Sequence, residues 1–362
     1  MFQMMMTVLT VLMAAGCVYL VWRFHRFSFL RRWAGERKWL AWLLAAVPLL
    51  LIAAFFLINL YAVLIVWLHL TVILLLADLI GLVIRKIRRR PRGDTAGIIA
   101  VCFTVVYLAA GWFFAHHVFE TDYTFRTEKD LGAPRLRIVA IADSHLGITL
   151  SGEDFAAQME RVQQTQPDAV VIVGDYVDDD TCKEDMIAAC RALGELKTTY
   201  GVFFTYGNHD KGYFRYRDFS EQDLLEELAK NRVTVLRDEA VPLGEAILVG
   251  RQDRSTAGRA EAAALTAGLD RSKYIVMLDH QPNDYANEAA AGPDLVISGH
   301  THGGHIWPAG YVGIWTGAND KTYGVERRGN THFLVTSGIS GWGIPFKTGC
   351  ISEFVVIDIE GD

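Results

Sequence analysis

The hydrophobic and polar positions of this chain follow two different patterns, and the change falls near residue 120. Before it, apolar runs cover about residues 4–22, 39–84 and 98–119. A helix of about 46 residues would be about 69 Å long, roughly twice the ~30 Å hydrocarbon core of a bilayer. We therefore expect the middle run to fold back near Asn59-Leu60-Tyr61. The pattern predicts a transmembrane region over residues 1–119 with four helical spans, at about 4–22, 39–59, 62–84 and 98–119.

The first apolar run has a second interpretation, as a cleaved secretory signal peptide. A signal peptide carries a basic segment ahead of its apolar core and a small-residue cleavage pattern after it. Neither is present around residues 4–22, so the sequence favours a membrane span.

The short loops between the predicted spans indicate an orientation, because basic loops stay in the cytoplasm. The loop after span one and the loop after span three each hold six basic residues: Arg23, Arg26, Arg31, Arg32, Arg37 and Lys38, then Arg85, Lys86, Arg88, Arg89, Arg90 and Arg92. This places the region after span four on the outer face of the cell membrane. Four basic residues after span four favour the opposite orientation and keep it open: Arg126, Lys129, Arg135 and Arg137.

Charge divides the chain at the same place. Residues 1–119 hold 12 Lys and Arg and 3 Asp and Glu, whereas the remainder holds 23 and 38. An acidic region without a basic block argues against nucleic-acid binding.

The predicted spans hold a single carboxylate, Asp78, which argues against a transport pathway. The five cysteines are spaced unlike a thiolate metal site and are interpreted as free thiols or packing residues.

From about residue 133 the pattern changes to short β-branched runs separated by amphipathic stretches. Apolar runs over residues 136–142, 169–173 and 201–206 alternate with amphipathic stretches over 154–164 and 183–196. The later chain is richer in predicted strands, at 233–236, 246–249, 274–278, 295–297, 332–335 and 353–357. This alternation predicts an α/β layered domain over residues 135–362, joined to the membrane region by a linker over 120–134.

Five of these predicted strands end in Asp, Asn or His. The strand ends read Asp143-Ser-His145, Gly174-Asp175 with Asp178 beyond, Gly207-Asn208-His209-Asp210, Asp279-His280, and Gly299-His300-Thr-His302 with His305 beyond. One such end is ordinary turn chemistry, but five that each supply oxygen or imidazole ligands are hard to explain as turns alone. Ligands gather at the carboxyl ends of strands in α/β sheets, and this mixture suits Mn, Fe or Zn. Seven candidate ligands are too many for one ion and indicate two ions that share a carboxylate: Asp143, His145, Asp175, Asn208, His280, His300 and His302.

These motifs, in this order, resemble the calcineurin-like metallophosphoesterase superfamily over about residues 135–358. The segment from Ser337 to Gly349, with Glu353 beyond, resembles the branch of transmembrane proteins with a metallophosphoesterase domain. The resemblance implies a four-layer sandwich of two mixed β-sheets flanked by helices, with two divalent metal ions. It also implies that Asp143, His145 and His302 hold one ion, that Asn208, His280 and His300 hold the other, and that Asp175 bridges them.

Two residues depart from the pattern of that branch, which commonly has Gln where His305 stands and Arg where Lys347 stands. Neither belongs to the implied metal set, so the departures concern the surroundings of the metals or substrate preference. Asp178 is expected to support the metal ligands rather than to bind metal. Asp179 and Asp180, which follow it, are expected to form a solvated loop.

The implied mechanism divides the roles between metal ligands and one further histidine. Two divalent ions about 3.5–4 Å apart activate water and polarise a phosphoryl group. His209 is not needed as a ligand, so we expect it to stabilise the transition state and donate a proton to the leaving group. Asp210 is expected to orient or charge-pair that imidazole.

The sequence thus predicts a membrane-anchored, dinuclear metal-dependent phosphohydrolase. A tether to the membrane favours phosphodiester or pyrophosphate bonds of lipid-linked or envelope substrates, such as a UDP-2,3-diacylglucosamine-type compound or a phospholipid. The alternative is a metal-binding membrane sensor or scaffold without catalysis, for which His209 would have no use.

The stretch from Gly212 to Arg217 is either a lid with basic groups or the start of a surface helix. Nothing in the sequence indicates an oligomeric state.

Overall fold

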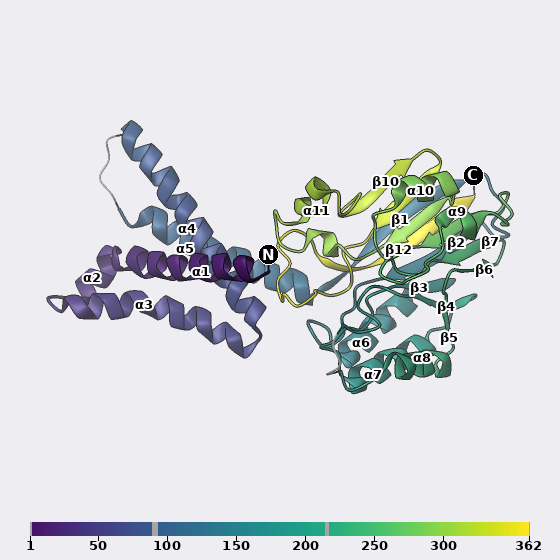
Figure 1. Cartoon of the computed structure of the whole chain (residues 1–362), viewed down its shortest axis with the longest axis horizontal. Coiled ribbons are helices and arrows are strands. Elements are labelled where there is room, and N and C mark those ends of the chain that lie inside the picture. The colour runs from purple at the N-terminus through teal and green to yellow at the C-terminus, as the bar shows by residue number, and fades with distance from the viewer. Residues whose placement is uncertain (1, 89–92, 214–216, 362) are drawn as a thin grey trace. The chain divides into compact units, whose positions relative to one another are not determined.

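The chain is represented by a computed structural model that describes residues 2–88, 93–213 and 217–361. It divides into two compact units, Met1–Ala110 and Gly111–Asp362 (Figure 1). Six residues discussed above lie outside the described part of the chain. They are Arg89, Arg90 and Arg92 of the second basic loop and Phe214, Arg215 and Tyr216 of the predicted lid.

The first unit is built of apolar helices. These are α1 (Phe2–His25), α2 (Ser28–Ala34), α3 (Lys38–Ala54) with the 3-10 turn η1 (Phe55–Leu57), α4 (Leu60–Arg88) and α5 (Thr95–His116), which runs on into the second unit. Among the described residues, the segments Lys38–Leu57, Leu60–Ile87 and Thr95–His116 are long and apolar enough to cross a membrane, and Thr10–His25 is a shorter apolar segment. A region of four apolar helices is confirmed. The expected turn is also present, because the side chain of Asn59 accepts a hydrogen bond from the Ala62 amide (2.8 Å) at the start of α4.

The lone carboxylate of the apolar runs has a structural partner inside the first unit. Asp78 on α4 lies 2.9 Å from Nε of Arg23 on α1 and accepts a hydrogen bond from the Tyr19 hydroxyl (3.2 Å). Arg23 is buried, and an ion pair of this kind neutralises both charges within an apolar environment. The pair therefore explains why one carboxylate stands in these helices without invoking transport.

The second unit contains two mixed six-stranded β-sheets, with orders β1-β12-β2-β3-β4-β5 and β10-β11-β9-β8-β7-β6. In the first sheet only the β12–β2 pair is antiparallel, and in the second only the β10–β11 and β6–β7 pairs are. The strands are β1 (Val118–Thr127), β2 (Arg135–Ile141), β3 (Ala169–Val173), β4 (Gly201–Thr205), β5 (Val233–Val235), β6 (Glu239–Leu243), β7 (Ala246–Gly250), β8 (Ile275–Leu278), β9 (Leu295–Ser298), β10 (Gly324–Arg328), β11 (Thr331–Val335) and β12 (Ser352–Gly361).

Helices cover the outer face of each sheet (Figure 1). The first sheet carries α6 (Gly152–Gln164), α7 (Lys183–Glu195) and α8 (Glu221–Lys230), and the second carries α9 (Ala262–Thr266) and α10 (Tyr285–Ala291). The short helices η2 (His302–Gly304) and α11 (Gly310–Thr316) follow β9. Ser151 and Ser220 begin α6 and α8 with reciprocal capping boxes, which satisfy amides that a helix start leaves unpaired.

The core of the second unit lies on both sides of each sheet. Successive side chains of a strand face opposite sides, so Val139 and Ile141 of β2 pack under the helices while Ile138 and Ala140 pack between the two sheets. A further cluster lies between the second sheet and its helices. The expected four-layer sandwich is confirmed.

Part of the segment expected to be a linker forms a strand of the first sheet. Residues 118–127 form β1, which pairs in parallel with β12 along ten residues at the edge of the first sheet. The last turn of α5 also belongs to this unit, since the Gly111 carbonyl accepts from the Lys347 amide (2.8 Å) and the Ala115 carbonyl accepts from the Ser352 hydroxyl (2.9 Å). Residues 120–127 of the predicted linker thus form part of the first sheet.

Candidate metal centre

The predicted ligands meet where five parallel strands of the two sheets end. Asp143, His145 and His302 form one group whose ligand atoms lie within 4.8 Å of one another, and Asp175, His280 and His300 form a second. The first residues of the two groups follow β2 and β3, which are parallel neighbours, and the histidines at 280, 300 and 302 follow β8 and β9, which are parallel neighbours in the facing sheet. Strand ends therefore bring together residues that are more than 150 positions apart in the sequence.

The backbone turns sharply at these positions. Five of the predicted ligands have φ in the left-handed region, which costs free energy for residues other than glycine: Asp143 (54°), His145 (36°), Asp175 (51°), His300 (70°) and His302 (48°). Gly174 (φ 75°) precedes the central carboxylate, and a Cβ there would lie 2.5 Å from the Gly207 amide nitrogen and 2.7 Å from Nδ1 of His280. The site thus concentrates backbone strain and needs glycine where neighbouring strand ends touch.

Three predicted ligands present buried polar atoms without a hydrogen-bond partner: Nε2 of His145, Nε2 of His280 and Oδ1 of Asn208. A buried polar atom left unpaired costs about 1–3 kcal/mol, so three at one place require an explanation. In both histidines the other nitrogen is held, Nδ1 of His145 by Asp178 (2.9 Å) and Nδ1 of His280 by the Val173 carbonyl (2.8 Å). Metal-binding histidines are typically held at their other ring nitrogen in this way.

Asp175 lies between the two groups. Its Oδ2 atom is 3.1 Å from Nε2 of His280 and 3.6 Å from Nε2 of His145. Its Oδ1 atom accepts a hydrogen bond from the His209 amide (2.8 Å). This is the position expected of a carboxylate that two metal ions share.

Charge and burial at the centre favour bound cations. Burial raises the pKa of Asp143 to about 6, whereas at Asp175 the effect of burial is outweighed by His280 and His145, which hold its pKa below the usual range. Burial lowers the pKa of His300 to about 4, and that of His302 falls well below its usual value for the same reason. At His145 and His280 the effect of burial is outweighed by neighbouring carboxylates, chiefly Asp178 and Asp175, which raise the pKa of both rings. The neutral imidazoles of His300 and His302 and the buried carboxylates are the ligand forms that divalent cations require. The donor set therefore fits two divalent ions.

His209 stands beside this set without belonging to either group. The centroid of its half-buried ring lies 5.1 Å from that of His145, 4.9 Å from Tyr213 and 5.4 Å from Trp342. Tyr213 also accepts a hydrogen bond from the side-chain amide of Asn208 (2.9 Å). The two aromatic residues are partly exposed and flank the imidazole, which the sequence pattern did not predict, since neither belongs to a ligand motif.

Asp210 binds backbone amides at the ends of two neighbouring strands. Its buried carboxylate accepts four backbone N–H groups, from Gly207 (2.6 Å), Asp175 (2.9 Å), Tyr176 (2.8 Å) and Val177 (3.1 Å). The described structure contains no hydrogen bond or ion pair between Asp210 and the imidazole of His209. Asp210 is therefore a positioning residue that joins the ends of β3 and β4, and it acts on the loop that carries His209 through backbone amides.

Of the three consecutive residues Asp178, Asp179 and Asp180, the first two make contacts that stabilise the loops around the centre. Asp178 contacts the ring of His145 as given above. Asp179 accepts from the Tyr213 amide (3.0 and 3.2 Å), so it joins the loop after β3 to the loop after β4, whereas Asp180 is exposed.

His305 and Lys347 are both held by backbone carbonyl oxygens of the loop from Ser337 to Gly349 and the residues just beyond it. The fully buried Lys347 ammonium donates to the carbonyl oxygens of Ser337 (2.8 Å), Gly338 (3.1 Å) and Ile351 (3.2 Å). His305 is half-buried, and its ring lies 3.0 Å from the Ile344 carbonyl oxygen; burial and the nearby Lys347 lower its pKa to about 3. Both residues stabilise the loop from Ser337 to Gly349, and the His305 ring lies next to that of the predicted ligand His302, with centroids 5.4 Å apart.

Comparisons with known proteins agree with this geometry. A family model described as Calcineurin-like phosphoesterase matches residues 136–304. An uncharacterized metallophosphoesterase of Aquifex aeolicus is 31% identical over 247 residues, which cover 66% of this chain and 90% of that protein. One from Campylobacter jejuni is 31% identical over 232 residues, which cover 62% of this chain but only 59% of that protein.

Two further similarities concern a membrane protein and a solved structure. A transmembrane protein with metallophosphoesterase domain from Danio rerio is 29% identical over 236 residues, which cover 61% of this chain and 52% of that protein. A solved dimetal phosphatase from Danio rerio aligns with a TM-score of 0.39 and 12% identity, covering 57% of this chain and 88% of that one.

Proposed function

Because this chain belongs to the calcineurin-like phosphoesterase family, we propose that it is a membrane-anchored phosphohydrolase whose second unit works with two divalent metal ions. One observation carries the proposal most directly. Nε2 of His145, Nε2 of His280 and Oδ1 of Asn208 are buried without a hydrogen-bond partner, and the two imidazole nitrogens lie 3.6 and 3.1 Å from Oδ2 of Asp175. Metal coordination satisfies all three atoms at once.

Each ion would have its own ligands and one shared carboxylate. Asp143, His145 and His302 would hold the first ion, and Asn208, His280 and His300 the second, with Asp175 common to both. Two bound divalent ions supply activation of a water nucleophile and neutralisation of phosphoryl charge. Mn, Fe and Zn all suit this donor set.

His209 would act on the leaving group. Its backbone N–H is fixed on Asp175, so the imidazole is held next to the phosphoryl position while remaining outside both ligand groups. From there its ring N–H can donate a hydrogen bond, and then a proton, to the oxygen that departs from phosphorus. The contact of Asp178 with His145 and the four amide contacts of Asp210 keep this arrangement rigid.

The substrate we propose is a phosphodiester or pyrophosphate carried by a membrane lipid or another envelope compound. Apolar helices and similarity to a transmembrane relative support membrane association. Trp342 and Tyr213 beside His209 provide an apolar wall for the departing group. The excess of basic residues in the two short loops supports four spans with the second unit on the outer face.

The test is an activity screen of the full chain in nanodiscs after chelation and reloading with Mn, Fe or Zn. Substrates are p-nitrophenyl phosphate, bis-p-nitrophenyl phosphate, a nucleotide-linked acyl sugar and a phospholipid. We expect metal-dependent hydrolysis, with diester or pyrophosphate substrates preferred over the monoester. Saturating metal binding without hydrolysis of any of them would instead support the alternative, a metal-binding membrane sensor or scaffold.

A further inference from the structure

An exposed aromatic surface lies on the second unit next to the metal centre. Trp307 is 60% exposed, and on α11 Tyr311 is 54%, Val312 is 51% and Trp315 is 74% exposed. The rings of Tyr311 and Trp315 stack with centroids 5.9 Å apart. Single exposed apolar residues are ordinary, but a contiguous patch of large ones marks a contact with a partner or a membrane. These four residues are called the α11 surface below.

The chain around the α11 surface carries almost no charge. Residues 295–319 contain no Asp, Glu, Lys or Arg, although the second unit is acidic overall. Residues 331–352 contain one, Lys347, and it is fully buried. The two segments touch, because the Trp307 amide donates to the Thr348 hydroxyl (3.1 Å). Moving this surface out of water therefore requires no desolvation of an ionised group from either segment.

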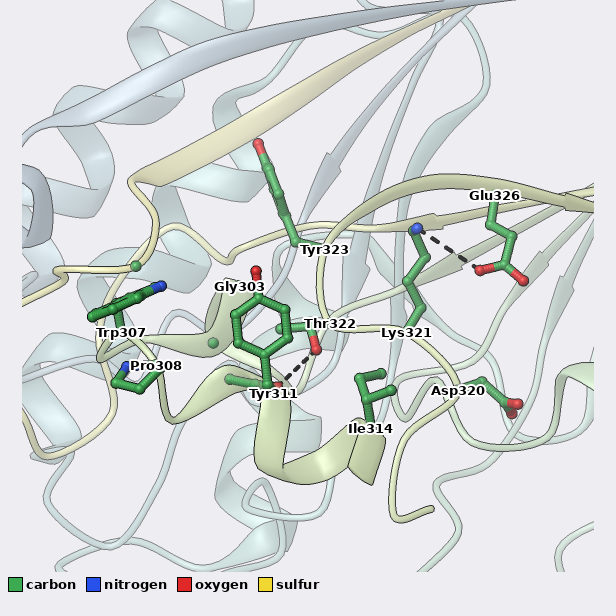
Figure 2. Close-up of a pocket in the computed structure, with 13 residues that line it drawn as sticks. Gly303, Trp307, Pro308, Tyr311, Ile314, Asp320, Lys321, Thr322, Tyr323 and Glu326 are labelled. Carbon is green, nitrogen blue, oxygen red and sulfur yellow. Dashed lines mark hydrogen bonds and ion pairs between the residues drawn. The ribbon is translucent and has the colours of Figure 1, made fainter. Parts of the chain in front are cut away.

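The α11 surface borders a cavity of about 430 Å³ that reaches the metal loop. The cavity is lined by Trp307, Tyr311, Ile314, Thr322 and Tyr323 and also by the charged residues Asp320, Lys321 and Glu326 (Figure 2). The cavity is also lined by Gly303 and Gly304, which directly follow His302. Whatever the α11 surface binds is thereby brought next to the loop that carries a metal ligand.

The last turn of α5 joins a candidate membrane span to the second unit. Thr95–His116 is apolar enough to cross a membrane, and its end from Gly111 belongs to the second unit. Trp112 packs edge-on against Phe346 (5.6 Å between centroids), and the Lys347 amide donates to Gly111. Residues 346–348 therefore connect the end of a membrane helix directly to Trp307.

We propose that the α11 surface lies in the interfacial layer of the membrane and that the second unit binds the lipid surface through it. Trp and Tyr prefer this layer, where an apolar ring and a polar edge are both satisfied. The contact would hold the metal loop at the level of the lipid head groups. A phosphoester of a membrane lipid could then reach the centre without leaving the bilayer. The inference rests on the membrane part of the proposed function and does not depend on phosphoester hydrolysis.

The experiment places a photoreactive residue at single positions of the full chain. Trp315→p-benzoylphenylalanine and Tyr311→p-benzoylphenylalanine are prepared separately and reconstituted in nanodiscs of phosphatidylcholine and phosphatidylglycerol with radiolabelled phosphatidylcholine. The matched control is Tyr200→p-benzoylphenylalanine. Tyr200 is an exposed aromatic residue of the same unit that directly precedes β4, at the strand end opposite to the metal centre. Lipid adduct per chain is measured after irradiation.

We expect several-fold more lipid adduct at positions 315 and 311 than at position 200. Equal adduct at the three positions would overturn the proposal. Crosslinks from 315 and 311 chiefly to a second copy of the chain, to the apolar helices of the first unit, or to another protein would overturn it as well. Two positions on α11 guard against misfolding of either variant. Because lipid adduct is read without catalysis, a failure here is distinguishable from a failure of the phosphohydrolase assay.

Discussion

The imidazole of His145 is held by Asp178, whose Oδ2 atom lies 2.9 Å from Nδ1 of the ring. This contact fixes the ring so that Nε2 faces Asp175 (3.6 Å). The contact shows how a residue outside both ligand groups can orient a candidate metal ligand. It connects the loop after β2 to the loop after β3.

Asp178→Asn should therefore weaken metal binding without unfolding the protein. The neutral amide no longer stabilises the imidazole orientation as a carboxylate does, and loss of such a partner lowers metal affinity about 10–100-fold. Metal affinity is measured by competition with a chelator of known strength. Asp180→Asn, two residues further on and exposed, is the control and should bind metal normally. Equal affinity in both variants would show that the contact has no role in metal binding.

Asp210→Ala should lower stability instead of removing a catalytic group. Four backbone N–H groups would lose their buried acceptor, and each unpaired buried group costs about 1–3 kcal/mol. We expect a fall in unfolding free energy of at least about 3 kcal/mol, together with weakened metal binding because the ends of β3 and β4 separate. Chemical denaturation of the metal-free protein measures it. Unchanged stability combined with a lower kcat would restore the direct catalytic role that the structure does not support.

Lys347→Met should also act on stability. Three carbonyl oxygens lose their common donor inside the loop from Ser337 to Gly349, at a cost of about 2–4 kcal/mol. Lys230→Met, which removes an exposed lysine of α8, is the control and should stay within about 0.5 kcal/mol of the parent protein. Thermal unfolding and KM are compared for both variants. A changed KM at normal stability would mean that Lys347 contacts substrate after all.

The ion pair between β2 and β12 should make stability depend on pH. The guanidinium of Arg137 donates two hydrogen bonds of 2.7 Å to Asp358 and holds the pKa of that carboxyl below its usual range. A group with a lowered folded-state pKa stabilises the fold above its unfolded-state pKa, and this contribution is lost as pH falls through the folded-state value.

The measurement compares unfolding temperatures of the parent protein and Asp358→Asn between neutral and acidic pH. The difference should be largest at neutral pH and shrink on acidification. Glu360→Gln, on the same strand with a carboxylate 3.8 Å from Arg126, should show a much smaller difference. A gap between parent and Asp358→Asn that widens as pH falls would contradict the assignment.

Much of the fold and of the candidate centre follows from local sequence signals. The buried strands read as β-branched runs, and ligand-type residues at their ends are visible one strand at a time. The direction in which each side chain points is not visible in this way. His209 and Asp210 are adjacent in sequence, yet one faces the centre and the other turns to the amides of the β3 loop, because only the folded backbone determines where neighbouring side chains point.

The other differences between the expected and the observed structure also have physical reasons. β1 was missed because Phe119 extends the apolar run of α5 while Glu120 and Asp122 interrupt the strand pattern, as suits an edge strand with one exposed face. The burial of Lys347 was not predicted, because lysine is rarely buried and three converging carbonyl oxygens cannot be foreseen from sequence. The α11 surface follows the metal loop in a glycine-rich stretch, where no periodicity predicts a helix.

The measurement that tests the central claim most directly is the metal content of two variants of the full chain, taken together with their kcat. Asp175→Ala removes the shared carboxylate, so metal and activity should fall together. His209→Ala should keep two ions per chain and lose about 3–4 kcal/mol of transition-state stabilisation, roughly a 10²–10³-fold drop in kcat. Metal loss in His209→Ala comparable to that in Asp175→Ala, or fewer than two ions in the parent protein at saturating Mn, would contradict the account.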